Sequence, residues 1–130
     1  MSIAAEVVAF LDLSAVGTSA VTLFADEMPD APVECLVVQD YPGRAPEYIL
    51  GQALPNLEFY SVQVKVRAAT KTAARTLIRS AYNALAPIRN QTVGSAFWLK
   101  ATPLQQPSFL SMDANRKPSY VFNMEIEKRR

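Results

Sequence analysis

Residues 58–86 read EFYSVQVKVRAATKTAARTLIRSAYNALA, and two structural patterns meet in this stretch. In its first part, residues 58–68, apolar and polar side chains alternate, which is typical of a β-strand with one dry and one wet face. From Thr70 onward the apolar side chains recur at helical spacing, and Thr70 is a favourable N-cap. Pro87 then ends the helix, because its nitrogen cannot donate a hydrogen bond. A strand followed at once by an amphipathic helix predicts a sheet covered by helices.

The same patterns, followed outward, predict the other elements. Residues 2–13 repeat apolar side chains at helical spacing, with Ser2 as the N-cap and with Glu6 and Asp12 facing away from the apolar stripe. Prolines and glycines interrupt the chain twice, which indicates two long connections. The expected strands cover residues 21–25, 33–39, 58–68, 95–102 and 120–127, the second helix ends at residue 85 or 86, and the long connections cover residues 40–56 and 103–118.

These elements predict an α+β fold, with a single mixed, mostly antiparallel sheet of about four to five strands and two helices packed on one face. The chain has 130 residues, about the length of one domain, so a single domain over residues 1–130 is expected. The apolar faces of the strands would pack beneath the helices. The opposite face would be either wet or in contact with another subunit. It carries Gln63, Lys65, Arg67, Asn123, Glu125 and Glu127.

Several residue types and motifs on which enzymes rely are missing. The sequence has no histidine, the usual base of serine and cysteine triads and the commonest zinc ligand. It has four glycines and no P-loop, dinucleotide-binding or G-x-S-x-G motif. Asp26, Glu27 and Asp30 form the only tight acidic cluster, but two prolines and no glycine make that loop a poor metal site. We therefore expect that the protein is not an enzyme and that it binds no cofactor or metal. Of the functional classes considered, an enzyme that uses scattered carboxylates is the least favoured.

Membrane insertion and secretion are not expected either. No stretch reaches the roughly 18 to 20 apolar residues that span a bilayer. The N-terminal segment has no basic residue before its apolar part, so it lacks the pattern of a secretory signal. Cys35 is the only cysteine and lies in an apolar run, which predicts a small buried hydrophobic residue. These features indicate a protein made in the cytoplasm, with no membrane partner.

The charges are unevenly distributed along the chain. Residues 1–64 hold nine acidic and one basic side chain, and residues 65–130 hold twelve basic and three acidic, so the two halves carry formal charges of −8 and +9. Either the halves interleave in the fold and cancel locally, or opposite faces of the folded subunit carry opposite charge. In the second case the subunits could pack head to tail, and such a contact forms a ring when its rotation closes.

The predicted second helix carries a basic stripe on its outer face. Lys71, Arg75 and Arg79 follow one another at four-residue spacing, and this helix contains no acidic residue that could pair with them. A solvated helix face, a contact with another subunit and a contact with nucleic-acid phosphates are all compatible with this pattern. The aromatic residues that would read nucleic-acid bases are not interleaved with the stripe.

Three segments in this order resemble the small minor-capsid and tail-terminator (neck) proteins of long-tailed bacteriophages. In that family an early helix leads to a strand and a Tyr-x-Gly-x-x-Pro-like loop, and a Val-Gln-Val-x-Val-Arg strand and an Ala…Tyr…Leu helix follow. The resemblance covers residues 1–86 and the last strand. The matching segments are QDYPGRAP at residues 39–46, VQVKVRA at residues 62–68 and ARTLIRSAYNAL at residues 74–85.

This resemblance implies a structural virion protein that is made in the host cytoplasm and resides in the tail or neck. It would form a ring, typically a hexamer, on the last ring of the tail tube. The ring would stop tube polymerisation and offer a surface to the head-tail connector protein, while DNA passes through the lumen without sequence readout. The alternatives are a head-completion or connector protein of the neck and a small nucleic-acid-binding regulatory module.

Residue roles follow from the ring. At the subunit interface the basic side chains would meet acids of a neighbouring copy. Arg44, on a Pro-Gly loop, would reach the lumen or an adjacent ring. The apolar side chains of the second long connection would dock on a tail or connector protein. The basic set is Arg67, Lys71, Arg75 and Arg79, the acidic set is Asp26, Glu27, Asp30 and Asp40, and the docking set is Phe109, Leu110 and Met112.

Overall fold

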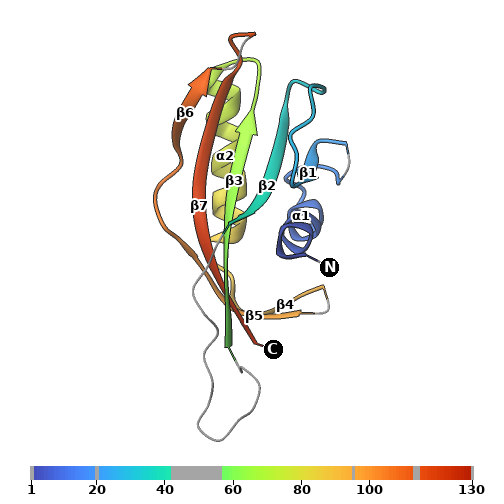
Figure 1. Ribbon diagram of the computed structural model, residues 1–130, viewed down its shortest axis with the longest axis vertical. Helices are drawn as coiled ribbons and strands as arrows, with labels where there is room; N and C mark the ends of the chain where they lie inside the picture. Colours follow the sequence, from blue (N-terminus) through green and yellow to red (C-terminus); the bar gives the residue numbers. More distant parts are fainter. Residues whose placement is uncertain (1, 20, 42–56, 95, 113–114, 130) are drawn as a thin grey trace, which may run out of the picture.

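The computed structural model describes residues 2–19, 21–41, 57–94, 96–112 and 115–129 (Figure 1). These residues form two helices and seven strands. Of the first predicted connection, residues 40–56, positions 42–56 lie outside the described residues, and Arg44 is among them. The elements are α1 (Ile3–Leu13), β1 (Leu23–Ala25), β2 (Cys35–Tyr41), β3 (Leu57–Arg67), α2 (Lys71–Leu85), β4 (Arg89–Val93), β5 (Ala96–Pro103), β6 (Ser108–Met112) and β7 (Pro118–Arg129).

The strands form one mixed, mostly antiparallel sheet in the order β1-β2-β3-β7-β5-β4. Only the pairing of β1 with β2 is parallel among the described strands. The long strands β3 and β7 pair along their whole shared length at the centre. β5 and β6 divide the remaining edge of β7 between them, β5 along residues 124–129 and β6 along residues 118–121. β1 therefore lies at one lateral edge of the sheet, and β4 and β6 lie at the other.

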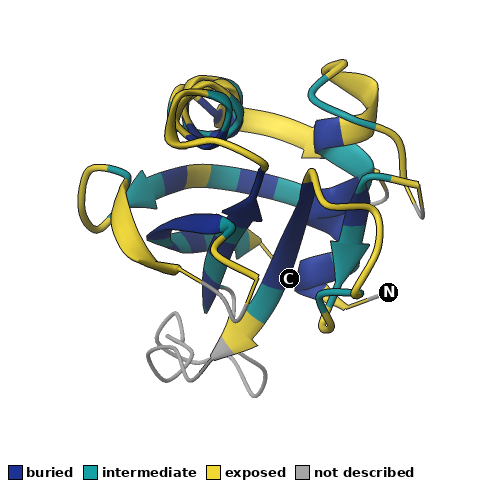
Figure 2. Cartoon of the chain, turned by 90° about the horizontal axis from the view of Figure 1, so that it is seen from above, coloured by how far each residue is buried: buried dark blue, intermediate teal, exposed yellow. Residues whose placement is uncertain are grey.

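Both helices cover the same face of this sheet. α1 packs on β1 and β2, and α2 packs on β3 and β7. The buried surface of α2 is turned toward the strands and its exposed surface away from them (Figure 2). One hydrophobic cluster joins both helices to the strands, and its largest fully buried side chains include Trp98, Phe122 and Leu11. The helix-facing valines of β3, namely Val62, Val64 and Val66, are completely buried in it.

The predicted fold class, the mixed sheet and the two helices on one face are confirmed. The predicted N-caps are confirmed as well: the Ser2 hydroxyl accepts from the Ala5 amide at 3.1 Å, and the Thr70 hydroxyl accepts from the Ala73 amide at 3.2 Å. Each cap satisfies an amide that the first turn of a helix leaves unpaired. Neither helix in the described part of the chain is long and apolar enough to cross a membrane.

The sheet has more strands than the four to five that the sequence predicted, because β4 and β6 were missed. Four of the five β4 residues and all five β6 residues are exposed, so neither strand shows an alternation of buried and exposed side chains. Both are held by backbone pairing to a single neighbour. β6 lies within the stretch of residues 103–118 that was expected to be a connection. The signal that could have revealed β4 is Gly94, whose φ of 63° opens the turn into β5.

The expectation that Glu6 faces away from the core is wrong. Glu6 is only 6% exposed, and its carboxylate lies 3.0 Å from the Lys128 ammonium of β7. The indole nitrogen of Trp98 on β5 donates to the other carboxylate oxygen at 3.4 Å. One buried carboxylate thus connects α1 to two strands from the far end of the chain.

The face of the sheet opposite the helices is not uniformly wet. Ser61, Arg67 and Ser119 point to this face and are less than 9% exposed. A row of amide side chains crosses it in register, from Gln39 through Gln63 to Asn123. Together with Asp26 and Asp40 this row lines a hollow of about 450 Å³.

Candidate subunit interface

One lateral edge of the sheet carries only acidic charge. Residues 1–43 contain no lysine or arginine, and this part of the chain forms α1, β1 and β2. Every acidic side chain of the described residues in this part is exposed except Glu6. We call this surface the acidic edge. Its exposed carboxylates belong to Asp12, Asp26, Glu27, Asp30, Glu34 and Asp40.

Backbone and side-chain contacts fix the position of the acidic edge. The Asp26 amide donates to the Val38 carbonyl at 2.8 Å, and the Gln39 side chain donates to the Asp26 carbonyl at 3.0 Å. Asp26 takes a φ of 75° where β1 turns into the following loop, a conformation that aspartate tolerates better than most residues. Partial burial, and secondarily the negative charge of Asp26, raise the pKa of Asp40. The carboxylates of Asp26 and Asp40 therefore repel each other within the subunit, and a cation from outside would relieve this repulsion.

Arg67, which the sequence assigned to the subunit interface, is 8% exposed and lies beneath the acidic edge. Its guanidinium donates to four carbonyl oxygens of the loop between β1 and β2. The distances are 2.7 Å to Pro29, 3.2 Å to Asp30, 2.8 Å to Pro32 and 3.1 Å to Val33. In the described structure Arg67 therefore positions the loop that carries Glu27 and Asp30.

Replacing Arg67 by lysine is expected to loosen this loop. A lysine ammonium keeps the charge but cannot present the planar set of donors that reaches four carbonyls. We expect the free energy of unfolding to fall by about 1–2 kcal/mol, since the variant loses some of its hydrogen bonds to a charged donor. Protease cleavage between residues 26 and 34 should become faster. Chemical denaturation and limited proteolysis would measure both effects, and unchanged cleavage would contradict the anchoring role.

The segment of the chain that forms the opposite edge carries only basic charge. Residues 68–112 contain no aspartate or glutamate, and they form α2, β4, β5 and β6. Lys71, Arg75 and Arg79 are exposed along α2, as the helical spacing predicted. Arg89 of β4 and Lys100 of β5 are exposed on the same side of the sheet. We call this surface the basic edge.

Neighbouring side chains hold the three α2 cations in place. The Lys71 ammonium lies 4.7 Å from the centre of the Phe109 ring. Arg75 donates from Nε to the Tyr120 hydroxyl at 3.0 Å. Arg79 donates to the Gln106 amide oxygen at 3.3 Å and lies over the Tyr82 ring. These partners are neutral, and among the described residues no carboxylate pairs with any of the three cations.

A groove runs between α2 and the segment that leads into β6. It has a volume of about 530 Å³. Both guanidinium groups of α2 border it, and each keeps N–H donors beyond those used within the subunit. Such a groove can receive carboxylates, because a guanidinium binds a carboxylate through paired hydrogen bonds. It is lined by Arg75, Thr76, Ile78, Arg79, Ser80, Asn83, Pro107 and Tyr120.

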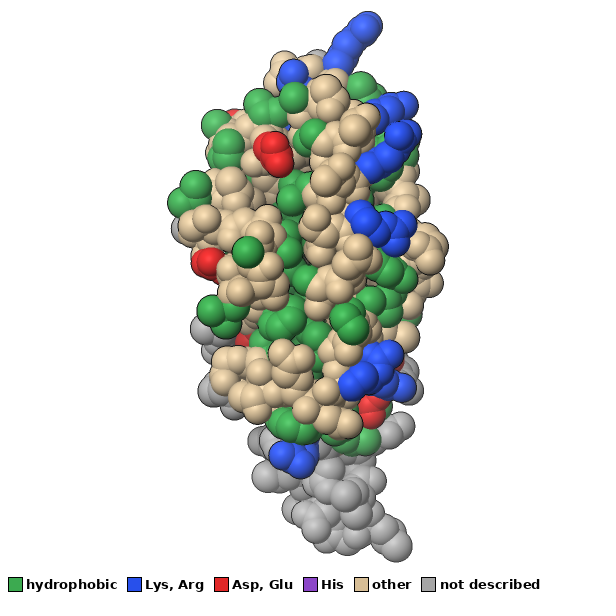
Figure 3. Space-filling model, turned by 180° about the vertical axis from the view of Figure 1, so that it is seen from behind, with side chains coloured by type: hydrophobic (Ala, Val, Ile, Leu, Met, Phe, Trp, Pro, Cys, Tyr) green, Lys and Arg blue, Asp and Glu red, His purple; other side chains and the backbone are tan. Residues whose placement is uncertain are grey.

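The strands of the two edges lie on opposite sides of the central strands β3 and β7, and Lys71 and Arg79 of α2 contact side chains on the β6 side. Figure 3 shows lysine and arginine side chains along one side of the molecule and acidic side chains toward the other. The charge separation seen in the sequence is therefore also a separation in space. The structure brings the predicted acids together at one edge and the three α2 cations together at the other. Arg67, which the sequence placed with these cations, lies instead beneath the acidic edge.

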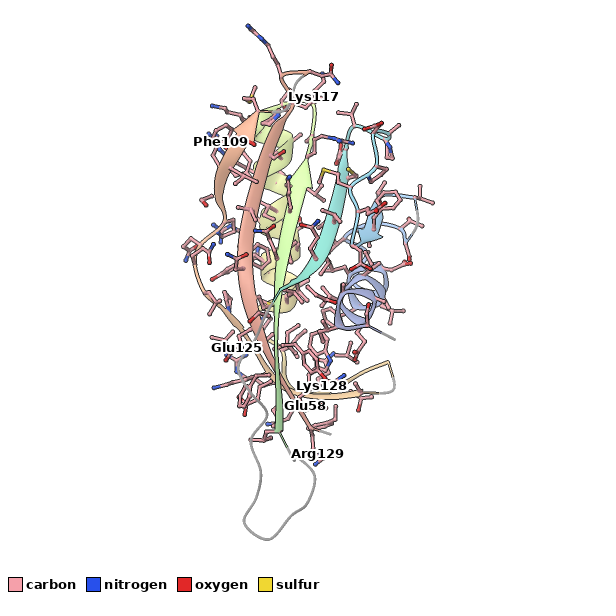
Figure 4. The ribbon with its side chains drawn as sticks, in the orientation of Figure 1. Glu58, Phe109, Lys117, Glu125, Lys128 and Arg129 are labelled. Carbon is pink, nitrogen blue, oxygen red and sulfur yellow. The ribbon has the colours of Figure 1, made fainter. Side chains whose placement is uncertain are left out.

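The apolar residues expected to contact a partner are exposed and lie at the basic edge. Phe109, Leu110 and Met112 are 43–46% exposed on β6, and Figure 4 shows Phe109 on the outer side of the sheet. Sequence reasoning missed a second group of exposed apolar side chains, which lies at the acidic edge. This group consists of Leu13, Val21 and Val33. Val33 was expected in a buried strand, but it is 41% exposed and precedes β2.

Among the described residues, no group of three or more acidic, cysteine or histidine side chains is placed to hold a metal ion. Burial raises the pKa of the Cys35 thiol, and the nearby Arg67 opposes this shift. The features that distinguish this chain are thus its two charged edges.

Comparison with known proteins identifies the family. The family model of the bacteriophage tail terminator protein matches residues 10–130. A search of curated proteins finds no match.

Solved structures share the fold at low sequence identity. One, from the virion of a native gene transfer agent particle, is 13% identical. It covers 82% of this chain and 78% of its own, with a TM-score of 0.54. Another solved chain is 12% identical and covers 99% of this chain and 98% of its own, again with a TM-score of 0.54. The family match over most of the sequence shows that the chain belongs to the bacteriophage tail terminator family, whose members are structural, non-enzymatic components of the virion tail.

Proposed function

We propose that six copies of this chain form a closed ring on the last ring of the tail tube. The ring stops tube polymerisation and presents its other surface to the head-tail connector protein. DNA passes through the lumen without sequence-specific binding.

The observation that carries this proposal is the placement of opposite charge on the two lateral edges. A contact between the acidic edge of one copy and the basic edge of the next is heterologous, so it repeats around a rotation axis. Two like edges would repel each other, which disfavours a symmetric pair. A head-to-tail contact therefore remains, and it gives a ring when the rotation closes.

The proposed contact pairs particular side chains. Lys71, Arg75 and Arg79 of one copy face Asp26, Glu27 and Asp30 of its neighbour, with Asp40 beside them. Because the three cations are held by aromatic and amide groups, they lose little side-chain freedom when they bind carboxylates. Arg67 contributes by positioning the acidic loop.

The proposal is tested by adding the purified protein to the tail-tube protein of the same particle while tubes are growing. Electron microscopy should show one ring at an end of each tube, and the tubes should become shorter as the protein concentration rises. Native mass spectrometry of the ring should give about six times the chain mass of 14.3 kDa. Binding along the sides of tubes, or tubes of unchanged length, would contradict the proposed function.

A further inference from the structure

The exposed apolar side chains occupy the same two edges as the charges. The described residues contain seven large hydrophobic side chains that are exposed, and none of them lies on the central strands β3 or β7. Three belong to the part of the chain that forms the acidic edge, and four belong to the part that forms the basic edge. The first group is Leu13, Val21 and Val33, and the second is Leu104, Phe109, Leu110 and Met112.

In each group some of the apolar side chains lie next to a charge of the sign that marks their edge. Leu13 follows Asp12 in sequence and is 86% exposed, and Val33 precedes Glu34. At the other edge the Lys71 ammonium lies over the Phe109 ring. Stable protein interfaces have this composition, with an apolar centre and a charged, solvent-accessible rim.

We propose that the two apolar groups are the two halves of one seam between neighbouring copies of this chain. Leu110 and Met112 of one copy pack against Leu13 and Val21 of the next, while the charges surround them. This inference rests on the proposed ring. The sequence suggested that the β6 side chains dock on a tail or connector protein, whereas here they contact a neighbouring copy of the chain. The choice of a second copy follows from charge complementarity, since the acidic edge supplies the opposite charge that the rim of the β6 surface requires.

The structure of β6 suits it to a fixed binding surface. β6 pairs with β7 alone in the described sheet, so its outer edge is uncovered. The Phe109 ring packs edge-to-face on Tyr120, with ring centres 5.6 Å apart, which holds the strand on the body of the subunit. The backbone of β6 is therefore held in place before any partner binds, and this lowers the entropic cost of binding.

Two variants with neutral substitutions test the seam without altering its charges. In Leu110→Ser/Met112→Ser the basic edge loses its apolar part, and in Leu13→Ser/Val21→Ser the acidic edge loses its apolar part. Each variant alone should associate at least about tenfold more weakly than the wild-type chain in sedimentation equilibrium, since each loses buried apolar contact. Lys65→Ser on the central strand β3 is the control and should associate as the wild type does.

Mixing the two variants gives the decisive measurement. Each retains the edge that the other lacks, so an equimolar mixture should form heterodimers with the affinity of one wild-type seam, and it should form no closed ring. A mixture that associates as weakly as the separate variants would overturn the inference, because the two apolar groups would then not face each other.

A different result would separate this inference from the proposed function. If Leu110→Ser/Met112→Ser still forms rings but the rings no longer stop the growth of tail tubes, the β6 surface binds the tube. The inference would then be wrong and the proposed ring would stand. If the wild-type chain forms no rings at tube ends at all, the proposed function itself is wrong.

Discussion

Replacing Glu6 by alanine is expected to lower the free energy of unfolding by about 3 kcal/mol, the scale seen when one member of a buried ion pair is removed. The Glu6 side chain is 7% exposed and that of Lys128 is 16% exposed. Without the carboxylate, the Lys128 ammonium and the Trp98 indole both lose a partner in a place that water reaches poorly. The cost therefore comes mainly from the groups left behind.

Urea unfolding followed by tryptophan fluorescence would measure this loss, because Trp98 is the only tryptophan and is completely buried. The matched control is Lys100→Ala, which breaks an ion pair of 3.8 Å whose lysine side chain is 50% exposed. Such exposed pairs contribute about 0–1 kcal/mol. Equal losses in Glu6→Ala and Lys100→Ala would show that the buried carboxylate has no special role.

The ion pair of Glu6 also shows where sequence reasoning stops. Local patterns were sufficient for the caps at Ser2 and Thr70, for the alternation in β3 and for the stripe of α2, because each depends on residues a few positions apart. Glu6 was expected in solvent because its helix alone offers it no partner. Its partners Trp98 and Lys128 lie 92 and 122 positions away. The pairing of β7 with β5 places Trp98 beside Lys128, and the packing of α1 in the fold brings Glu6 to both.

The two surfaces of the proposed interface could be predicted from the sequence to a similar, partial degree. The charge separation is visible in the sequence, and the structure preserves it in space because β1 and β2 lie on one side of β3 and β7, and β4, β5 and β6 lie on the other, where Lys71 and Arg79 of α2 contact side chains. The burial of Arg67 was not predictable, since its carbonyl partners lie in a loop more than 30 positions earlier. The exposure of Val21 and Val33 was missed because apolar residues in short runs normally indicate buried strands.

Reversing the charges of the basic edge is expected to abolish the ring while leaving the fold intact. In Arg75→Glu/Arg79→Glu two of the five cations of the basic edge become carboxylates, so neighbouring copies repel each other at the groove beside α2, where they attracted before. The seam should weaken by at least about 100-fold, since two favourable charge contacts become unfavourable. Sedimentation and electron microscopy of tube ends would measure the loss. Lys65→Glu, a reversal on the central strand β3, is the control and should leave the ring unchanged.

A second reversal makes the test specific to the contact between edges. In Glu27→Lys/Asp30→Lys the loop between β1 and β2 presents two cations to the α2 cations of the next copy, so this variant alone should also form no ring. Mixed with Arg75→Glu/Arg79→Glu, it offers an opposite charge at every contact, and the two variants should alternate around the axis. Alternation closes only when the number of copies is even, so a hexamer predicts that the mixture recovers closed rings with three copies of each variant. Recovery of open chains without closed rings would argue for an odd copy number. A mixture that fails to associate at all would show that the two charged edges do not meet.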